Sequence, residues 1–136
     1  MIIADTSGLL ALFNKREPTH DAVRRIVEGV DEPLVVSPYV VAELDYLLAT
    51  RVGVEAEIAA LTELAGGAYH LPGLGADLLA AAVAVVTRYN DQQIGVADAS
   101  IVVLADLYRT RSVLTLDRRH FELLRPLSGG HFRVLP

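Results

Sequence analysis

Four carboxylates, in segments far apart in the sequence, occupy places where an acid can do chemistry. Asp5 directly follows the apolar run Ile2–Ala4, and Asp117 directly follows the run Val113–Leu116. If both runs are strands of one parallel sheet, both acids lie at its carboxyl edge, where such sheets bind ligands. Either acid alone could instead be an ordinary helix N-cap. Together they predict an acidic crevice at that edge.

Glu43 and Asp98 fall in helical segments with apolar surroundings. Residues one turn away from Glu43 are apolar or aromatic, which predicts a place on the apolar helix face; they are Tyr39, Val40, Tyr46 and Leu47. Asp98 lies in the mostly apolar stretch 95–105, in the first turn of its helix, where the dipole favours an anion. A buried carboxylate without a cation is costly or becomes neutral. No Arg or Lys lies within a helical turn of either acid, so we expect a divalent cation, the alternative being a buried acid that is only hydrogen-bonded.

The ligand set indicates which cation. Carboxylates offer hard oxygen atoms, the chain has no Cys, and no two of its four His have ligand spacing, which favours Mg²⁺ or Mn²⁺ over zinc. Two such ions, about 3.5–4 Å apart, can clamp the attacking and leaving oxygens of a phosphodiester displacement. The predicted chemistry is therefore metal-assisted hydrolysis, with the acidic cluster formed by Asp5, Glu43, Asp98 and Asp117.

Three hydroxyl residues, Thr6, Ser7 and Thr115, flank the predicted cluster and could donate to water or to a phosphate. Helix capping and strand propensity are the alternatives, favoured more for Ser7 than for Thr6. Two further acids are expected outside the site, with Asp45 facing away from Glu43 and Asp91 in a turn. For His120 we expect packing or capping in the last helix.

The elements that would position these residues alternate along the chain. Short apolar runs and amphipathic segments follow one another, which is typical of a parallel sheet covered on both faces. We expect one α/β domain over residues 1–136, a small doubly wound sandwich. Strands are expected at 2–4, 34–36, 68–71, 112–116 and 132–135, and helices at 8–13, 21–29, 39–51, 54–65, 77–89, 96–108 and 120–124.

Composition excludes several classes of protein. A chain of 136 residues with 52% hydrophobic content can bury a core and is not a disordered tail. The absence of Cys excludes disulfides, thiolate nucleophiles and Cys-ligated zinc. The N-terminus lacks the basic region of a signal peptide, and the longest apolar run, 78–86, is shorter than a membrane span. We expect a soluble cytoplasmic protein.

The net charge of −5 conceals an asymmetry. Residues 1–106 hold 6 basic and 15 acidic groups, whereas residues 107–136 hold 6 Arg against Asp117 and Glu122, a net +4. The planar guanidinium suits phosphate, so a phosphate-binding face is possible at this end. The alternative is that these arginines only solvate the last helix and strand.

Four segments, in this order and with family-like spacing, resemble the PIN-domain ribonucleases and, more narrowly, the VapC toxins of bacterial toxin–antitoxin modules. They are Asp5-Thr6-Ser7, 41–44 (Val-Ala-Glu-Leu), 94–99 (Ile-Gly-Val-Ala-Asp-Ala) and 114–121 (Leu-Thr-Leu-Asp-Arg-Arg-His-Phe). A single piece such as Asp-Thr-Ser is weak, but the series is specific, and the resemblance covers essentially the whole chain.

The resemblance implies a PIN-like three-layer α/β/α sandwich with a short, mostly parallel sheet. It implies a Mg²⁺- or Mn²⁺-dependent endoribonuclease toxin that inhibits translation by cleaving structured RNA, either tRNA or the sarcin–ricin loop of 23S rRNA. Asp5 and Asp98 would be the main metal ligands, with Glu43 and Asp117 completing the catalytic pocket. Arg118 and Arg119, with Thr6 and Thr115, would contact RNA. The implied partners are a VapB-type antitoxin and a second copy of the chain, with no membrane.

Three alternatives differ in class. A phosphatase or receiver using Asp5 as nucleophile would need an acid at position 7 or a late Lys, and the chain has Ser7 and no Lys beyond Lys15. A housekeeping PIN-domain nuclease for rRNA maturation or DNA would keep the site, but the chain leaves no room for a flap nuclease's arch. An inactive nuclease-fold binding module would have no reason to keep Glu43 and Asp98.

Overall fold

The computed structural model describes all residues 1–136 and contains a short, fully parallel sheet. Its strands are β1 (Ile2–Ala4), β2 (Val35–Val36), β3 (Ser112–Leu114) and β4 (Arg133–Leu135), in the order β2-β1-β3-β4. Ile3 pairs with Val35 on one side and Val113 on the other, and Val113 pairs with Val134. The first and third strands are therefore neighbours, as the predicted acidic crevice requires.

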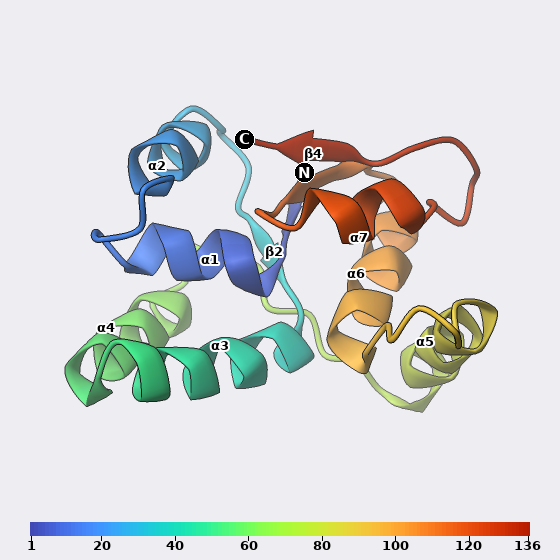
Figure 1. Cartoon of the computed structure of the whole chain (residues 1–136), viewed down its shortest axis with the longest axis horizontal. Coiled ribbons are helices and arrows are strands. Elements are labelled where there is room, and N and C mark those ends of the chain that lie inside the picture. Colours follow the sequence, from blue (N-terminus) through green and yellow to red (C-terminus); the bar gives the residue numbers. More distant parts are fainter.

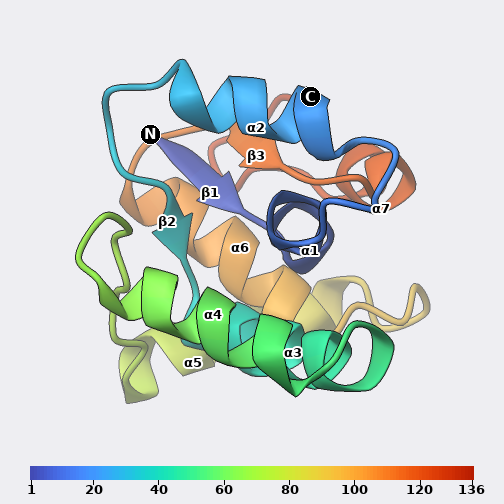
Figure 2. The same ribbon diagram turned by 90° about the vertical axis from the view of Figure 1, so that its left-hand side faces the viewer.

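Helices cover both faces of the sheet, which confirms the three-layer α/β/α prediction. They are α1 (Thr6–Phe13), α2 (His20–Glu28), α3 (Pro38–Arg51), α4 (Val54–Ala65), α5 (Ala76–Arg88), α6 (Val96–Leu107) and α7 (Arg118–Leu123). Helix α2 lies on one side of the strands, and α6, α3, α4 and α5 lie on the other (Figure 2). Helix α1 continues from β1 and packs on α2 and α3, whereas α7 follows β3 at the same end (Figure 1).

The predicted 68–71 strand is the one incorrect element. Only His70 pairs there, through an isolated parallel bridge to Val35, where β2 itself has just two residues. A strand this short offers few partners, so residues 68–71 stay mostly irregular. The predicted strand at 112–116 also ends early, at Leu114, because Thr115 and Leu116 turn toward α7.

The core lies between the sheet and α6. The residues of β1 and β2 are almost completely buried, whereas the edge strand β4 is partly exposed. Helix α6 buries every residue from Ala99 to Ala105, as predicted for a helix that is apolar nearly all round. Such a helix cannot rotate or shift without exposing apolar surface. The core therefore fixes where the first turn of α6, which carries Asp98, meets the carboxyl end of the sheet.

Candidate active site

Asp5 occupies the junction of β1 and α1 and is held by two hydroxyl groups. It is 5% exposed, and its Oδ2 accepts hydrogen bonds from Thr115 Oγ1 at 2.7 Å and from Ser7 Oγ at 3.0 Å. Although Asp5 stands at the N-cap position of α1, its side chain does not cap that helix. The capping alternative therefore does not apply to Asp5, and the carboxylate is left for the crevice.

Ser7 and Thr115 position this carboxylate from two sides. Ser7 Oγ accepts the backbone N–H of Leu116 at 2.9 Å, and Thr115 Oγ1 accepts that of Asp117 at 2.9 Å. Each hydroxyl is thus fixed by the turn that follows β3 while it donates to Asp5. Ser7, for which capping was the favoured alternative, is instead part of this support.

Gly8 makes the close approach of α1 to β3 possible. A Cβ atom at this position would lie 2.4 Å from the carbonyl oxygen of Leu114, closer than real contacts allow. Glycine therefore lets the first turn of α1 rest on the end of β3, where Ser7 reaches Thr115. Sequence reasoning missed Gly8, since a glycine inside a helical pattern gives only a weak signal of close backbone packing.

Burial sets the electrostatics of Asp5. Desolvation raises the pKa of its carboxyl, while the hydrogen bonds from Thr115, the Thr6 backbone and Ser7 lower it, and the nearby charge of Glu43 raises it again. No Lys, Arg or His forms an ion pair with Asp5. A buried acid in this state fits a cation as the missing partner.

Asp98 is half-buried in the first turn of α6 and belongs to the same electrostatic cluster. Desolvation by burial raises the pKa of its carboxyl to about 6, and repulsion from Asp5, Glu43 and Asp117 adds to the rise, opposed by His120. The charges of Asp5, at the end of β1, of Glu43, on α3, and of Asp117, after β3, therefore all act on Asp98, and the charge of Glu43 also acts on Asp5.

Glu43 reaches this cluster from a different helix face than predicted. It is exposed, and the buried stripe of α3 consists of Val40, Leu44 and Leu48. The prediction that Glu43 lies on the apolar face was wrong, because Tyr46, counted as an apolar neighbour, is itself 67% exposed. Glu43 is thus open to solvent, and its charge acts on both Asp5 and Asp98.

A buried pair of serines sets α3 against α6. Ser37 caps α3 by accepting the backbone N–H of Tyr39 at 3.2 Å, and Ser100 Oγ lies 2.7 Å from Ser37 Oγ. Both residues are fully buried, so this polar contact fixes the register of the two helices. The link keeps Glu43 and Asp98 on the same side of the molecule, and sequence reasoning did not single it out.

Asp117, the fourth predicted acid, contacts His120. Asp117 caps α7 by accepting the backbone N–H of His120 at 3.1 Å, so here the capping alternative is correct. Its other oxygen lies 3.0 Å from Nδ1 of His120, and the same nitrogen lies 3.6 Å from Asp98 Oδ2. His120 therefore bridges two of the four acids, a place that its capping or packing prediction missed. The signal was its position three residues after a candidate N-cap acid.

The donor set fits a divalent cation, although the side chains do not form a closed metal cage. No three His or acidic side chains are arranged to hold one ion. Mg²⁺ usually takes one or two protein carboxylates and completes its shell with water and substrate phosphate. Asp5 and Asp98, whose charges repel each other, match that pattern. The four-ligand set stays a prediction.

The four residues predicted to contact RNA differ in access. Thr115 is 1% exposed with its hydroxyl engaged, so it positions Asp5 and does not face a substrate. Thr6 is 3% exposed, and its buried Oγ1 has no hydrogen-bond partner. Arg118 and Arg119 are exposed in the first turn of α7, and Arg118 donates to the carbonyl oxygen of Pro136 at 2.8 Å.

The two acids predicted to lie outside the site do so. Asp45 lies near Glu57 of α4 and raises the pKa of that carboxyl, so it faces α4. Asp91 is exposed in the turn before α6.

Comparisons with known proteins agree with this geometry. Residues 2–125 match the PIN domain. Ribonuclease VapC26 of Mycobacterium tuberculosis is 61% identical over 135 residues, which cover 99% of this chain and all of that protein. The solved structure of M. tuberculosis VapC20, described as a sarcin–ricin loop cleaving toxin, superposes over the full length of both chains with a TM-score of 0.86 at 22% identity. A toxin–antitoxin complex from Klebsiella pneumoniae matches 82% of this chain and 83% of its own with a TM-score of 0.62 at 20% identity.

Proposed function

The chain belongs to the PIN-domain family and is a VapC-type ribonuclease, and from this premise we propose that it is the toxin of a toxin–antitoxin pair that cleaves structured RNA with the help of Mg²⁺ or Mn²⁺. One observation supports the proposal most: Asp5 and Asp98, from different ends of the sequence, repel each other and have no Arg or Lys partner. Apart from His120, whose Nδ1 lies 3.6 Å from Asp98 Oδ2, no protein cation balances this negative charge.

In the proposed mechanism the role of each of the four acids follows from its burial and its contacts. Asp5 is rigid, because Thr115 and Ser7 fix its oxygen, and Asp98 is fixed by the buried helix α6; these two would hold the cation. Glu43, exposed at the open side, would orient water or a second ion. When bound, a divalent cation acidifies water and neutralises charge that builds up on the phosphate during displacement.

Asp117 would complete the pocket while serving as the cap of α7. The cap fixes the start of α7, where Arg118 and Arg119 are exposed one and two residues after Asp117, and we propose that they bind RNA phosphates. Substrate backbone would then cross the exposed carboxylate of Glu43 before it reaches the buried carboxylate of Asp5.

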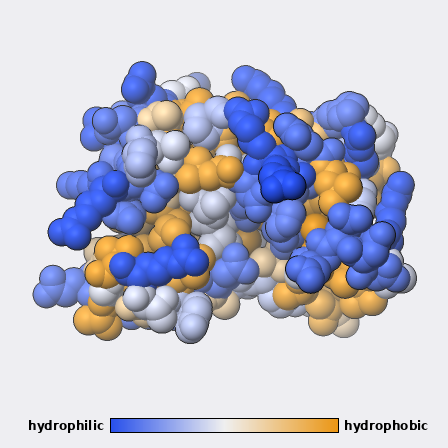
Figure 3. Space-filling model, in the orientation of Figure 1, coloured by the Kyte–Doolittle hydropathy of each residue, from blue (hydrophilic) through white to orange (hydrophobic).

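We further propose the partners that the family resemblance implies, namely a VapB-type antitoxin and a second copy of the chain. Apolar surface gathers over the α3–α4 pair and over α5 (Figure 3). Several large side chains there are exposed, among them Tyr46, Val54, Ile58 and Val83. Exposed patches of this kind mark interaction surfaces. No helix is both long and apolar enough to cross a bilayer, and we propose that residues 1–136 act as one domain in the cytoplasm.

The experiment that tests this function induces the protein in bacterial cells and sequences the 5′ ends of cellular RNA. We expect growth arrest and new ends at one position, in a tRNA or in the sarcin–ricin loop, that are absent when Asp98→Asn is induced. Growth arrest with no new RNA ends would overturn the ribonuclease proposal. New ends spread over many rRNA precursors, without arrest, would favour the housekeeping alternative, and neither effect would favour the binding module.

A further inference from the structure

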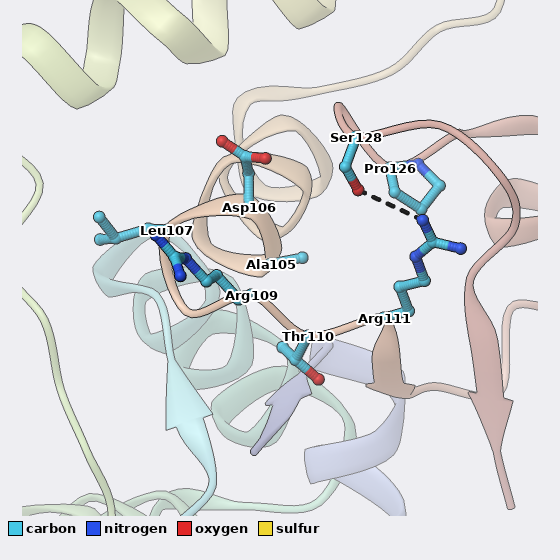
Figure 4. A pocket seen from close by; sticks show the side chains of 8 residues that line it. All are labelled: Ala105, Asp106, Leu107, Arg109, Thr110, Arg111, Pro126 and Ser128. Carbon is cyan, nitrogen blue, oxygen red and sulfur yellow. Dashed lines mark hydrogen bonds between the residues drawn. The ribbon is translucent and has the colours of Figure 1, made fainter.

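A second cavity lies at the end of β3 that is remote from the acidic cluster. It measures about 570 Å³ and opens between the end of α6, the turn 108–111 and the loop after α7. Arg109, Arg111 and Ser128 line it, and we name it the arginine pocket (Figure 4). Arg111 directly precedes β3, whereas Asp117 follows it, so the strand separates the arginine pocket from the carboxylates.

The guanidinium groups of the arginine pocket have no acidic partner. Neither Arg109 nor Arg111 forms a salt bridge, and the one acid in the lining, Asp106, projects away from the Arg111–Ser128 pair (Figure 4). Arg111 Nη2 lies 3.4 Å from Ser128 Oγ. The site therefore offers positive charge and a hydroxyl group with no carboxylate paired to them; Arg111 extends toward Ser128, and Arg109 extends to the side of Leu107 (Figure 4).

Gly130 makes room for Arg111. Its φ of 83° is in the left-handed region, and a Cβ atom there would lie 2.5 Å from Nη1 of Arg111. The left-handed backbone by itself favours glycine here, and the end of the Arg111 side chain packs against this glycine. Arg111 is thereby seated against the loop while its end stays open to solvent.

Further arginines continue along the edge strand β4. Arg133, exposed, is the register partner of Ser112, and its N–H donates to the carbonyl oxygen of Arg111 at 2.7 Å. At the other end of β4, Arg118 donates to the carbonyl of Pro136. Arg111, Arg133 and Arg118 therefore lie one after another along the β3–β4 edge of the sheet, from the arginine pocket to the start of α7.

We propose that the arginine pocket is a second phosphate-binding site, which holds the backbone of a folded RNA at a distance from the bond that is cut. The inference rests on the proposed function and deepens it: the substrate must be a structured RNA that spans the edge strand, while a short single strand fills only the acidic crevice. Guanidinium groups without acid partners bind phosphate and release counterions, so this contribution is salt-dependent. The competing explanation is that charged residues on β4 merely prevent edge-to-edge pairing.

The test compares Arg109→Ala/Arg111→Ala with a matched control, Arg16→Ala/Arg51→Ala, which removes two exposed arginines elsewhere. Binding is measured by fluorescence anisotropy in EDTA, with a labelled tRNA, a labelled sarcin–ricin hairpin and a short single-stranded oligonucleotide. For the folded RNA that the enzyme cleaves, we expect affinity to fall about tenfold in the pocket variant and the salt slope to decrease by about 2. The control and the short oligonucleotide should show no such change.

A second variant separates charge from folding. Arg109→Lys/Arg111→Lys keeps the positive charges, so its salt slope should match the wild type, and thermal unfolding checks that every variant is folded. If the alanine variant binds RNA with unchanged affinity and unchanged salt dependence, the proposal that the pocket binds RNA phosphate is wrong. RNA cleavage, and hence the proposed function, would remain intact. A second contrary result is that the alanine variant loses the stabilisation that inorganic phosphate gives the wild type and yet binds RNA unchanged. That result would overturn the RNA-binding proposal and indicate a site for a free anion. If the wild-type protein itself cleaves no RNA, the proposed function is contradicted instead.

Discussion

The hydroxyl of Thr115 donates a 2.7 Å hydrogen bond to Asp5, a residue 110 positions earlier in the sequence. This bond joins the ends of two neighbouring parallel strands, β1 and β3, at the edge where ligands bind. It also fixes the oxygen that we propose as a cation ligand. Thr115 is completely buried, so the bond serves the geometry of Asp5 and not contact with substrate.

Thr115→Val tests this support with a side chain of nearly the same shape. Valine removes one of the two hydroxyl donors that hold Asp5 Oδ2, and with it an interaction that lowers the pKa of the carboxyl. We expect the rate of RNA cleavage to fall by about 10- to 100-fold, because mutation of a residue that hydrogen-bonds to a metal ligand typically has an effect of that size. Thr115→Ser, which keeps the hydroxyl, should recover most of the rate. Equal rates for the valine and serine variants would show that the bond has no such role.

Asp98→Asn should abolish cleavage while making the metal-free protein more stable. The neutral amide no longer repels Asp5, Glu43 and Asp117, and it avoids the desolvation of a charge. We expect a gain of about 1–2 kcal/mol in the free energy of unfolding, measured by urea denaturation in EDTA. Asp91→Asn, an exposed acid in a turn, is the matched control and should change neither quantity. Wild-type cleavage by Asp98→Asn would refute the ligand assignment.

The stability of the metal-free protein should depend on pH through the same group. Because folding raises the pKa of Asp98 from 3.8 to about 6, the folded state holds its proton more tightly than the unfolded state. As far as this group is concerned, the free energy of unfolding should therefore be highest below pH 3.8 and fall as pH rises through about 6, by about 3 kcal/mol in all. Urea titrations across this range, with Asp98→Asn as the reference, measure it. A stability difference between the two proteins that does not change with pH would contradict the assignment.

Gly8→Ala tests the contact between α1 and β3. The added Cβ would lie 2.4 Å from the Leu114 carbonyl oxygen, so α1 must shift and carry Ser7 away from Thr115. We expect a loss of about 1–3 kcal/mol of stability, as for other overpacked sites, together with reduced cleavage. Gly73→Ala, where a Cβ meets nothing within 4 Å, is the control and should leave both unchanged. A Gly8→Ala protein as stable as this control would mean that the close approach is unimportant.

Sequence periodicity was sufficient for most of the fold. The strand that precedes Asp5 and the apolar helix that carries Asp98 were predicted correctly, because a buried strand and a buried helix both leave uninterrupted apolar runs. The 68–71 segment was not, because a strand depends on its partners, and β2 supplies only two residues. Single-bridge pairing of His70 leaves no signature in sequence.

The acids of the site could be found from the sequence, but their supports could not. Carboxylates at strand ends and in apolar helices are unusual enough to identify Asp5, Asp98 and Asp117. The prediction that Glu43 is buried was wrong, because its four neighbours were counted as one apolar face although Tyr46 faces solvent. Ser37 with Ser100, and His120 with Asp98, meet only in the folded chain, since their partners come from other elements.

The central claim is that these carboxylates hold a metal that cleaves RNA, and a cleavage assay with purified protein tests it most directly. Total bacterial RNA is incubated with the antitoxin-free wild type in Mg²⁺ or Mn²⁺, with the wild type in EDTA, and with Asp5→Ala in the same metals. We expect discrete RNA fragments only where both the metal and Asp5 are present. Discrete fragments that persist in EDTA or with folded Asp5→Ala would contradict it.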